Sequence, residues 1–330
     1  MIQNSKVQHI LFITSSRIGD AVLSSGLLNY MHSEYPNAKF TISCGPLAVS
    51  LFEGFPNLER IIPLKKQKYN KHWIGLWSDI VGTNFDIVVD LRNSAVSRLI
   101  RACERYVYGS YVDKEIHKVE QNASIMKLSG TPPSPKLWFS DDQIKMAKDL
   151  IPSDDGGKVL GVGPTANWAG KTWPENRFIK VVEWLTNNNG LMPNARVAVF
   201  AAPGEEEAAR NVLSSVSKDR QLDIIAKTDP GSAAATISRC DFYIGNDSGL
   251  MHCAAAAGVP TFGLFGPSYP HIYSPWGEHT SYASTPKSFD ELIDYDGYSS
   301  ETCGCLMNDL SVDMVISAIE KSWPHIVSSF

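Results

Sequence analysis

The stretch FYIGNDSGLMHCAAAAGVPTFGLF, residues 242–265, contains a complete strand–helix–strand pattern. Its two ends, 242–245 and 261–265, are short apolar runs of the kind that form strands buried on both faces of a parallel sheet. Between them, residues 248–257 show a helical pattern whose alanines allow close packing against a sheet. Because parallel neighbours need a crossover connection, this stretch predicts an α/β fold.

The same alternation of strands and helices continues over the whole chain. Strand-like runs lie at 9–14, 39–44, 60–64, 85–91 and 106–108 in the first half, and at 159–163, 196–201 and 222–226 in the second. Helical patterns lie at 20–35, 177–187 and 205–217. Two such series predict two doubly wound, Rossmann-like domains, whose strand C-termini turn to a shared cleft.

The domain boundary is expected in the polar stretch 151–158, where Gly, Ser and Asp favour an exposed connector, or somewhat before it. We therefore divide the chain into a first domain, 1–155, and a second domain, 156–330. A last helical pattern, 312–323, follows the second series. This helix can pack back on the first domain.

The composition limits the classes of protein. With 330 residues the chain exceeds the usual size of one hydrophobic core, and its net charge of −5 argues against nucleic acid as a partner. No apolar stretch reaches the roughly 18 residues of a membrane span. No signal-peptide pattern opens the chain, so we interpret the six cysteines as thiols of a cytoplasmic protein.

The decisive stretch also carries chemistry at the start of its helix. Gly249 has no side chain to block a ligand, so the first-turn N–H groups are open to an anion such as a pyrophosphate. Asp247 and Ser248 precede it, and His252 follows one turn after Ser248 on a similar face. Capping by Asn and Asp, with a core histidine, explains each residue taken alone. The whole string is more specific.

Three further segments follow strand-like runs. Asp20 stands at the start of a helix, as a cap or as a carboxylate at the mouth of a cleft. Thr165 and Lys171 offer a hydroxyl and a cation that suit a diphosphate, although a solvated loop explains them too. The glutamates 205–207 complement a helix dipole, and such a carboxylate can also hold ribose hydroxyls.

Together these segments resemble glycosyltransferase family nine, the ADP-heptose–lipopolysaccharide heptosyltransferases. The family's R-x-G-D element is similar to residues 17–20, and its K-x-W-P element is similar to residues 171–174. Its G-x-D-[ST]-G-L-x-H element is similar to residues 245–252, followed by A-A-x-G-x-P at 255–260 and F-G-P at 265–267. The order of these elements holds from about residue 8 to residue 323.

The resemblance implies a GT-B type fold with an acceptor-side first domain and a second domain that binds the nucleotide-sugar. It implies that Asp20 is the general base, with Arg17 and Gly19 beside it. For the donor it implies a set of second-domain residues. They are Thr165 and Lys171 at the diphosphate, Glu205 or Glu206 at the ribose, Asp247 at the sugar, Ser248, Gly249 and Leu250 in the phosphate-binding turn, and His252, which completes the motif.

The implied reaction is an inverting transfer of heptose from ADP-heptose, the co-substrate, to a hydroxyl of a lipopolysaccharide core glycolipid. We expect no tightly bound cofactor or metal, because no D-x-D pair appears in a suitable loop and Lys171 with a helix N-terminus can stabilise the leaving diphosphate. A glycolipid acceptor implies peripheral contact with the inner face of the cytoplasmic membrane. The basic and aromatic segment 65–77 fits anionic lipid or sugar phosphates, and a solvated helix edge explains it equally well.

Three alternatives remain open. The first is a transferase of the same family that uses another nucleotide-sugar and another glycan acceptor. The second is a non-catalytic nucleotide-sugar-binding protein. The third is a nicotinamide-dependent oxidoreductase on the same architecture, against which the missing G-x-G-x-x-G fingerprint argues.

Overall fold

The computed structural model describes residues 7–153 and 157–327, and its contacts divide the chain into two compact units between Asp141 and Asp142. Unit 2 therefore includes most of α5 (Asp141–Leu150), because Leu150 and Ile151 pack with the apolar residues of its sheet. This division falls after the first residue of α5, ahead of the polar stretch 151–158. Asp155, the last residue of the first domain by sequence, lies outside the described residues.

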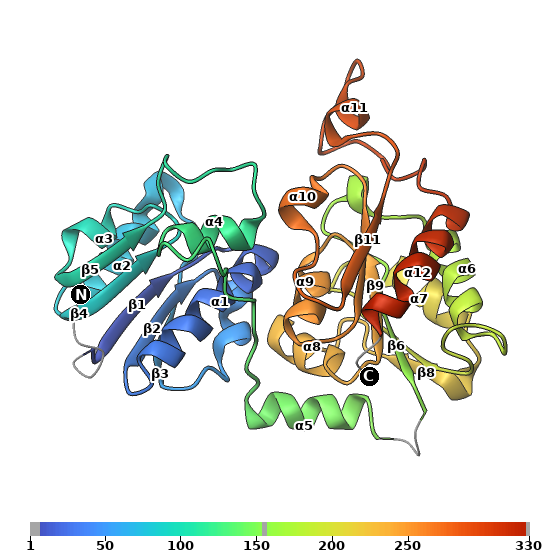
Figure 1. Cartoon of the computed structure of the whole chain (residues 1–330), viewed down its shortest axis with the longest axis horizontal. Helices are drawn as coiled ribbons and strands as arrows, with labels where there is room; N and C mark the ends of the chain where they lie inside the picture. Colours follow the sequence, from blue (N-terminus) through green and yellow to red (C-terminus); the bar gives the residue numbers. More distant parts are fainter. Residues whose placement is uncertain (1–6, 154–156, 328–330) are drawn as a thin grey trace. The chain divides into compact units, whose positions relative to one another are not determined.

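Unit 1 is built on a five-stranded parallel sheet of order β3-β2-β1-β4-β5 (Figure 1). Its elements are β1 His9–Ile13, α1 Ile18–Glu34, β2 Lys39–Cys44, η2 Pro46–Phe52, β3 Leu58–Pro63, η3 Lys68–Asn70, α2 Lys71–Ile80, β4 Phe85–Asp90, α3 Val96–Leu99, β5 Ala102–Val107 and α4 Lys118–Ser124. Leu76 and Ile80 of α2 pack on Val88 and Leu11 of the sheet. Helix α1 packs against α4.

Unit 2 is built on a six-stranded parallel sheet of order β11-β10-β9-β6-β7-β8. After α5, its elements are β6 Val159–Gly163, η4 Ala169–Lys171, α6 Glu175–Thr186, β7 Arg196–Val199, α7 Glu206–Ser214, η5 Lys218–Arg220, β8 Gln221–Asp223, α8 Pro230–Ile237, β9 Phe242–Asn246, α9 Gly249–Ala256, β10 Thr261–Phe265, α10 Pro270–Tyr273, β11 Thr280–Ser284, α11 Phe289–Ile293 and α12 Val312–Ile326. Helices α8 and α9 lie on one face, and α6, α7 and α12 lie on the other (Figure 1).

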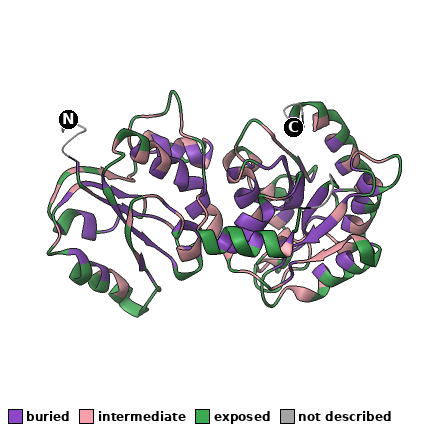
Figure 2. Cartoon of the chain, turned by 90° about the horizontal axis from the view of Figure 1, so that it is seen from below, coloured by how far each residue is buried: buried purple, intermediate pink, exposed green. Residues whose placement is uncertain are grey.

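Both sheets have the strand order of a doubly wound fold, which confirms the predicted fold class. Their central strands are buried on both faces (Figure 2), as their continuous apolar runs predicted. Strands β6, β9 and β10 are wholly buried. In each unit the strand order reverses at one point, between β1 and β4 and between β6 and β9. Ligands of such folds bind outside the carboxyl ends of the strands at this switch point.

The structure differs from the sequence analysis at the end of the chain. Strand β11 was not predicted, because Thr280–Ser284 lacks a continuous apolar run. Helix α12 packs in unit 2 against β11 and α6, and its Val315 and Ile319 are wholly buried there. Among the described residues, no helix is both long and apolar enough to span a bilayer.

Candidate functional site

The switch point of unit 2 brings two charged residues together. Lys171 follows β6, and Asp247 follows β9; they lie 76 positions apart in the sequence. The Lys171 Nζ and Asp247 Oδ2 atoms are 2.5 Å apart, and the two side chains are only 25% and 7% exposed. A partly buried ion pair at the carboxyl edge of a doubly wound sheet is well placed to meet a charged ligand.

The tryptophan of the K-x-W-P element fixes the loop that carries Lys171. Trp173 is wholly buried, its backbone N–H donates to Asn246 Oδ1 (3.1 Å), and its indole Nε1 donates to the Leu310 carbonyl (2.8 Å). Asn246 is the last residue of β9, directly before Asp247. The loop after β6 is therefore held to the β9 turn at two neighbouring points.

The turn into α9 contains polar groups that lack partners. Ser248 is the N-cap residue of α9, but its side chain makes no capping hydrogen bond. Among the described residues, the buried side-chain atoms without a hydrogen-bond partner include Asn246 Nδ2, Ser248 Oγ and, after β10, Ser268 Oγ. Since most buried polar groups in folded proteins are hydrogen-bonded, such a group of unsatisfied donors is typical of a place where a ligand supplies the acceptors.

The remaining residues of this motif lie at the same turn. Gly249 begins α9, an eight-residue helix, and Leu250 packs against the adjoining core cluster. The His252 Nε2 atom is 3.8 Å from Asp247 Oδ1, and the imidazole is 5% exposed. His252 is therefore a neighbour of the Lys171–Asp247 pair rather than a remote core histidine.

A cavity of about 590 Å³ lies between the loops after β6 and β7, and Ala169 and Thr172, on either side of Lys171 in the sequence, line it. Thr165 and Glu205, both predicted from the sequence, line it. Glu206 instead accepts a hydrogen bond from the Gly204 backbone N–H (3.0 Å), which lowers the pKa of its carboxyl group. Glu207, the third of the glutamates 205–207, also lines the cavity.

In unit 1, Asp20 lies in the first turn of α1, directly after β1. The helix begins at Ile18 with Arg17 as N-cap residue, so Asp20 is not the cap, and Gly19 separates it from the start of the helix. Its Oδ2 atom accepts a hydrogen bond from Ser15 Oγ at 3.4 Å. The carboxylate is partly exposed at the carboxyl edge of the sheet.

Two residues near Asp20 were not found from the sequence. The Lys118 ammonium donates to Gln121 Oε1 (3.2 Å) and lies 4.8 Å from the ring centre of Tyr108. Burial lowers the pKa of Lys118, and the charge of Asp20 opposes this shift; burial and then the same charge raise the pKa of Tyr108. Both side chains thus lie within electrostatic range of Asp20, and no local pattern marks them in the sequence.

The β1–β4 switch point also holds a buried carboxylate. Asp90, at the end of β4, is wholly buried and accepts hydrogen bonds from the Ser94 N–H (2.8 Å), the Ser94 hydroxyl (2.7 Å) and the Arg92 N–H (2.9 Å). These bonds fix the loop after β4. Its sequence context predicts a strand over 85–91 and marks Asp90 for no further role.

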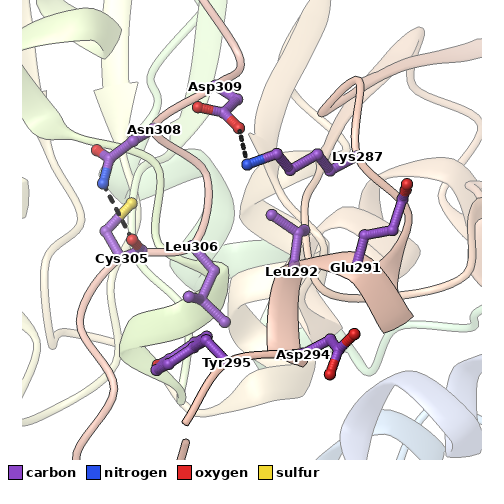
Figure 3. A pocket seen from close by; sticks show the side chains of 9 residues that line it. All are labelled: Lys287, Glu291, Leu292, Asp294, Tyr295, Cys305, Leu306, Asn308 and Asp309. Atoms are coloured by element: carbon purple, nitrogen blue, oxygen red, sulfur yellow. Dashed lines mark hydrogen bonds and ion pairs between the residues drawn. The ribbon is translucent and has the colours of Figure 1, made fainter.

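A second cavity of about 330 Å³ lies between α11 and the segment 305–309 (Figure 3). An ion pair between Lys287 Nζ and Asp309 Oδ2 (3.4 Å) crosses it. Cys305 lines both cavities, although no sequence pattern gave it a role. None of the site residues predicted from the sequence lines this second cavity.

Within residues 7–153 and 157–327, no three His, Cys, Asp or Glu side chains gather as a metal site would require. The expectation that the chain needs no metal stays a prediction.

Comparison with known proteins gives the family. The sequence profile of Glycosyltransferase family 9 (heptosyltransferase) matches residues 73–290. Lipooligosaccharide heptosyltransferase 2 of Campylobacter jejuni subsp. jejuni serotype O:6 is 26% identical over 269 residues, which cover 78% of this chain and 82% of that protein.

Two solved structures share the fold over nearly their whole length. A family 9 glycosyl transferase from Veillonella parvula DSM 2008 matches with a TM-score of 0.76 at 20% identity, covering 97% of this chain and 98% of that one. Escherichia coli heptosyltransferase WaaC with ADP matches with a TM-score of 0.70 at 17% identity, covering 95% and 99%. Because the family profile spans more than half of the sequence and the fold agrees with it, this chain belongs to glycosyltransferase family 9 and is a glycosyltransferase of the heptosyltransferase family.

Proposed function

We propose that the protein transfers heptose from ADP-heptose to a hydroxyl of a lipopolysaccharide core acceptor, with inversion at the anomeric carbon. Unit 2 binds the donor, and unit 1 binds the acceptor. The observation that carries the proposal is the Lys171–Asp247 pair at the β6–β9 switch point, where Lys171 lies on a loop whose residues Ala169 and Thr172 line the 590 Å³ cavity.

The residues proposed to bind the donor lie on the loops that follow neighbouring strands of the unit 2 sheet. The cavity beside Thr165, Glu205 and Glu207 suits the nucleoside, whose ribose hydroxyls are common partners of carboxylates in such folds. One strand further, Lys171 and the first turn of α9 suit the diphosphate, because a cation and open backbone N–H groups favour an anion. E. coli WaaC, of the same fold, was solved with ADP.

The acceptor side rests on Asp20. Its carboxylate accepts the proton of the acceptor hydroxyl while the hydroxyl oxygen bonds to the anomeric carbon and the bond to the diphosphate breaks on the opposite face. Lys171 and the α9 N–H groups stabilise the charge that builds on the leaving diphosphate. This arrangement supplies the stabilisation that a metal gives elsewhere, so we expect transfer to continue in excess EDTA.

The test is the variant Asp20→Asn, which keeps the shape of the side chain and removes its basicity. We expect turnover to fall by roughly 10²–10⁴-fold, the usual contribution of a general base. Thermal stabilisation by ADP should stay unchanged, because donor binding is assigned to unit 2. Near-normal turnover of Asp20→Asn would contradict the role of this residue.

The same stabilisation measurement distinguishes the donors, because a ligand that binds the folded state raises its stability with affinity. ADP, UDP, GDP and CMP are compared at one concentration. A shift with ADP alone supports an ADP-sugar donor. A shift with another nucleotide keeps the glycosyltransferase and replaces the sugar. Donor binding without transfer to any acceptor would favour a non-catalytic binding protein.

A further inference from the structure

We propose that the outer face of α2 and the loop before it form a surface that docks on an anionic lipid bilayer. We call this surface the α2 patch. Its basic residues are Lys65, Lys66, Lys68 and Lys71. Its apolar residues are Tyr69, Ile74, Trp77 and Val81.

The apolar residues of the α2 patch are unusually exposed. Tyr69 is 90% exposed, Ile74 65%, Trp77 39% and Val81 37%. Large apolar side chains that gather on a surface are typical of an interaction site, whereas single ones are ordinary. Here four of them lie within thirteen successive residues, so they need a common explanation.

The helix places these residues on one side. Successive residues of an α-helix are turned by about 100°, so Lys71, Ile74, Trp77 and Val81 fall within an arc of about 120°. Leu76 and Ile80 lie on the opposite side and are buried against the sheet. Helix α2 thus has two apolar sides, and the sheet covers only one of them.

The loop before α2 presents Tyr69 to solvent at a conformational cost. Tyr69 and Asn70 have φ angles of 56° each, in the left-handed region that residues with a Cβ atom rarely adopt. Backbone strain of this kind is concentrated at functional positions. The backbone here leaves exposed a tyrosine ring, with an apolar body and a polar tip, of the kind that is enriched at membrane–water interfaces.

The charge of the α2 patch points to an anionic partner. Residues 65–81 contain four lysines and one aspartate, a formal charge of +3, while the chain carries −5, so the rest of the molecule carries −8. The aspartate, Asp79, lies about 140° around the helix from Ile74 and outside the patch. Arg92 adds a further cation at its margin, 6.0 Å from the ring centre of Trp73.

A lipid bilayer fits this surface better than a second copy of the chain. Apolar residues that enter the interface, flanked by lysines that meet anionic headgroups, are the features of a peripheral membrane-binding helix. In a symmetric pair of chains the same patch would face itself, and its lysines would repel one another. The proposal agrees with a glycolipid acceptor, but it rests on the patch and not on the identity of the donor.

The experiment is co-sedimentation of the full chain with two kinds of vesicle. One is made of phosphatidylcholine alone, and the other of phosphatidylcholine mixed with the anionic lipid phosphatidylglycerol. We expect binding to the anionic vesicles, weak binding to the neutral ones, and release in high salt. Replacing the four lysines by alanine should weaken binding at least about tenfold. Ile74→Ser together with Tyr69→Ser should weaken it several-fold.

Matched controls separate the α2 patch from general effects of charge and exposure. Leu47→Ser removes an apolar side chain from η2 that is 65% exposed, the same as Ile74. Lys145→Ala with Lys148→Ala removes two exposed lysines from α5. Both controls should bind vesicles like the unchanged chain, and ADP should stabilise every variant equally.

Three results would overturn the proposal. They are equal binding to neutral and anionic vesicles, binding that the patch variants leave intact, and a concentration-dependent dimer that Ile74→Ser abolishes. The last result would identify a second copy of the chain as the occupant. Failure of heptose transfer with intact vesicle binding would contradict the proposed function and leave the α2 patch standing.

Discussion

Lys171 and Asp247 are the charged side chains that meet across the β6–β9 switch point. Asp247 is 7% exposed, so its carboxylate depends on the ammonium for a counter-charge. The same ammonium lies at the turn into α9 that the proposed function assigns to the diphosphate. One lysine therefore contributes both to the order of this loop and to binding.

For Lys171→Ala we expect ADP affinity to fall roughly 10–100-fold, the range of a charge-assisted hydrogen bond. The melting temperature without nucleotide should fall as well, because Asp247 loses its partner. Calorimetric titration with ADP and thermal unfolding measure the two effects. Lys180→Ala, an exposed lysine on α6, is the control and should change neither. Unchanged ADP affinity in Lys171→Ala would remove this residue from the donor site.

Tyr243 gives a prediction of stability at the residue scale. Its ring is wholly buried in β9, and its hydroxyl has no hydrogen-bond partner among the described residues. We expect Tyr243→Phe to leave the free energy of unfolding unchanged or to raise it by about 1 kcal/mol, because an unsatisfied buried hydroxyl is removed. Urea unfolding measures this. A clear loss of stability would mean that the hydroxyl is satisfied in solution.

The predicted site residues came from short motifs, and the limits of the prediction follow from that. Lys171, Asp247 and His252 stand in such motifs, and the structure brings them together. The choice among the glutamates 205–207 depends on the φ angle of +94° at Gly204 and on the bond this glycine makes with Glu206, neither of which a sequence pattern specifies. The charge of Asp20 affects the pKa of Lys118 only because tertiary packing brings the two residues near each other.

Helix α1 shows how an element's environment reverses a local preference. Gly26 lies inside this 17-residue helix, where alanine has the higher intrinsic helix propensity. A Cβ atom at Gly26 would lie 2.1 Å from the Pro133 carbonyl oxygen, so the helix and the segment beside it need the glycine for their close approach. Gly75 in α2 has open space around the same position.

These two glycines make a matched pair of variants. We expect Gly75→Ala to raise the free energy of unfolding by about 0.5–1 kcal/mol, from helix propensity alone. Gly26→Ala should lower it by about 1–3 kcal/mol, because the added methyl group forces the backbone apart. Urea unfolding of both variants decides the point. Equal effects of the two changes would contradict the close packing of α1.

The strands were predictable where both faces are buried and not where they are partly exposed. Continuous apolar runs marked β6, β9 and β10, and each lies in the sheet as expected. Strand β11 lies at the sheet edge and has only one buried residue, so it carries no such run. Helix α12 extends past Pro324 to Ile326, where the pattern ended at 323, since the proline lies in its last turn.

The whole chain consists of two units, each with its own core. The clusters around Leu160 and around Tyr243 lie in unit 2, and the cluster around Leu11 lies in unit 1. We therefore expect residues 142–330, produced alone, to fold and to bind ADP within about threefold of the full chain, because the proposed donor residues all lie in this unit. Calorimetric titration measures the affinity. A folded fragment without affinity for ADP would show that unit 1 contributes to the donor site.

The strand order of the unit 2 sheet also determines when the nascent chain is most prone to aggregate. Val159 at the start of β6 donates to the Asp241 carboxylate directly before β9, 82 positions later. At typical rates of synthesis, β6 is therefore made on the order of ten seconds before β9, its neighbour at the centre of the sheet. During that time a wholly apolar strand offers an unpaired edge to other nascent chains. Rare codons between these two strands would lengthen the wait, so the yield of soluble protein should depend on how quickly this part of the message is translated.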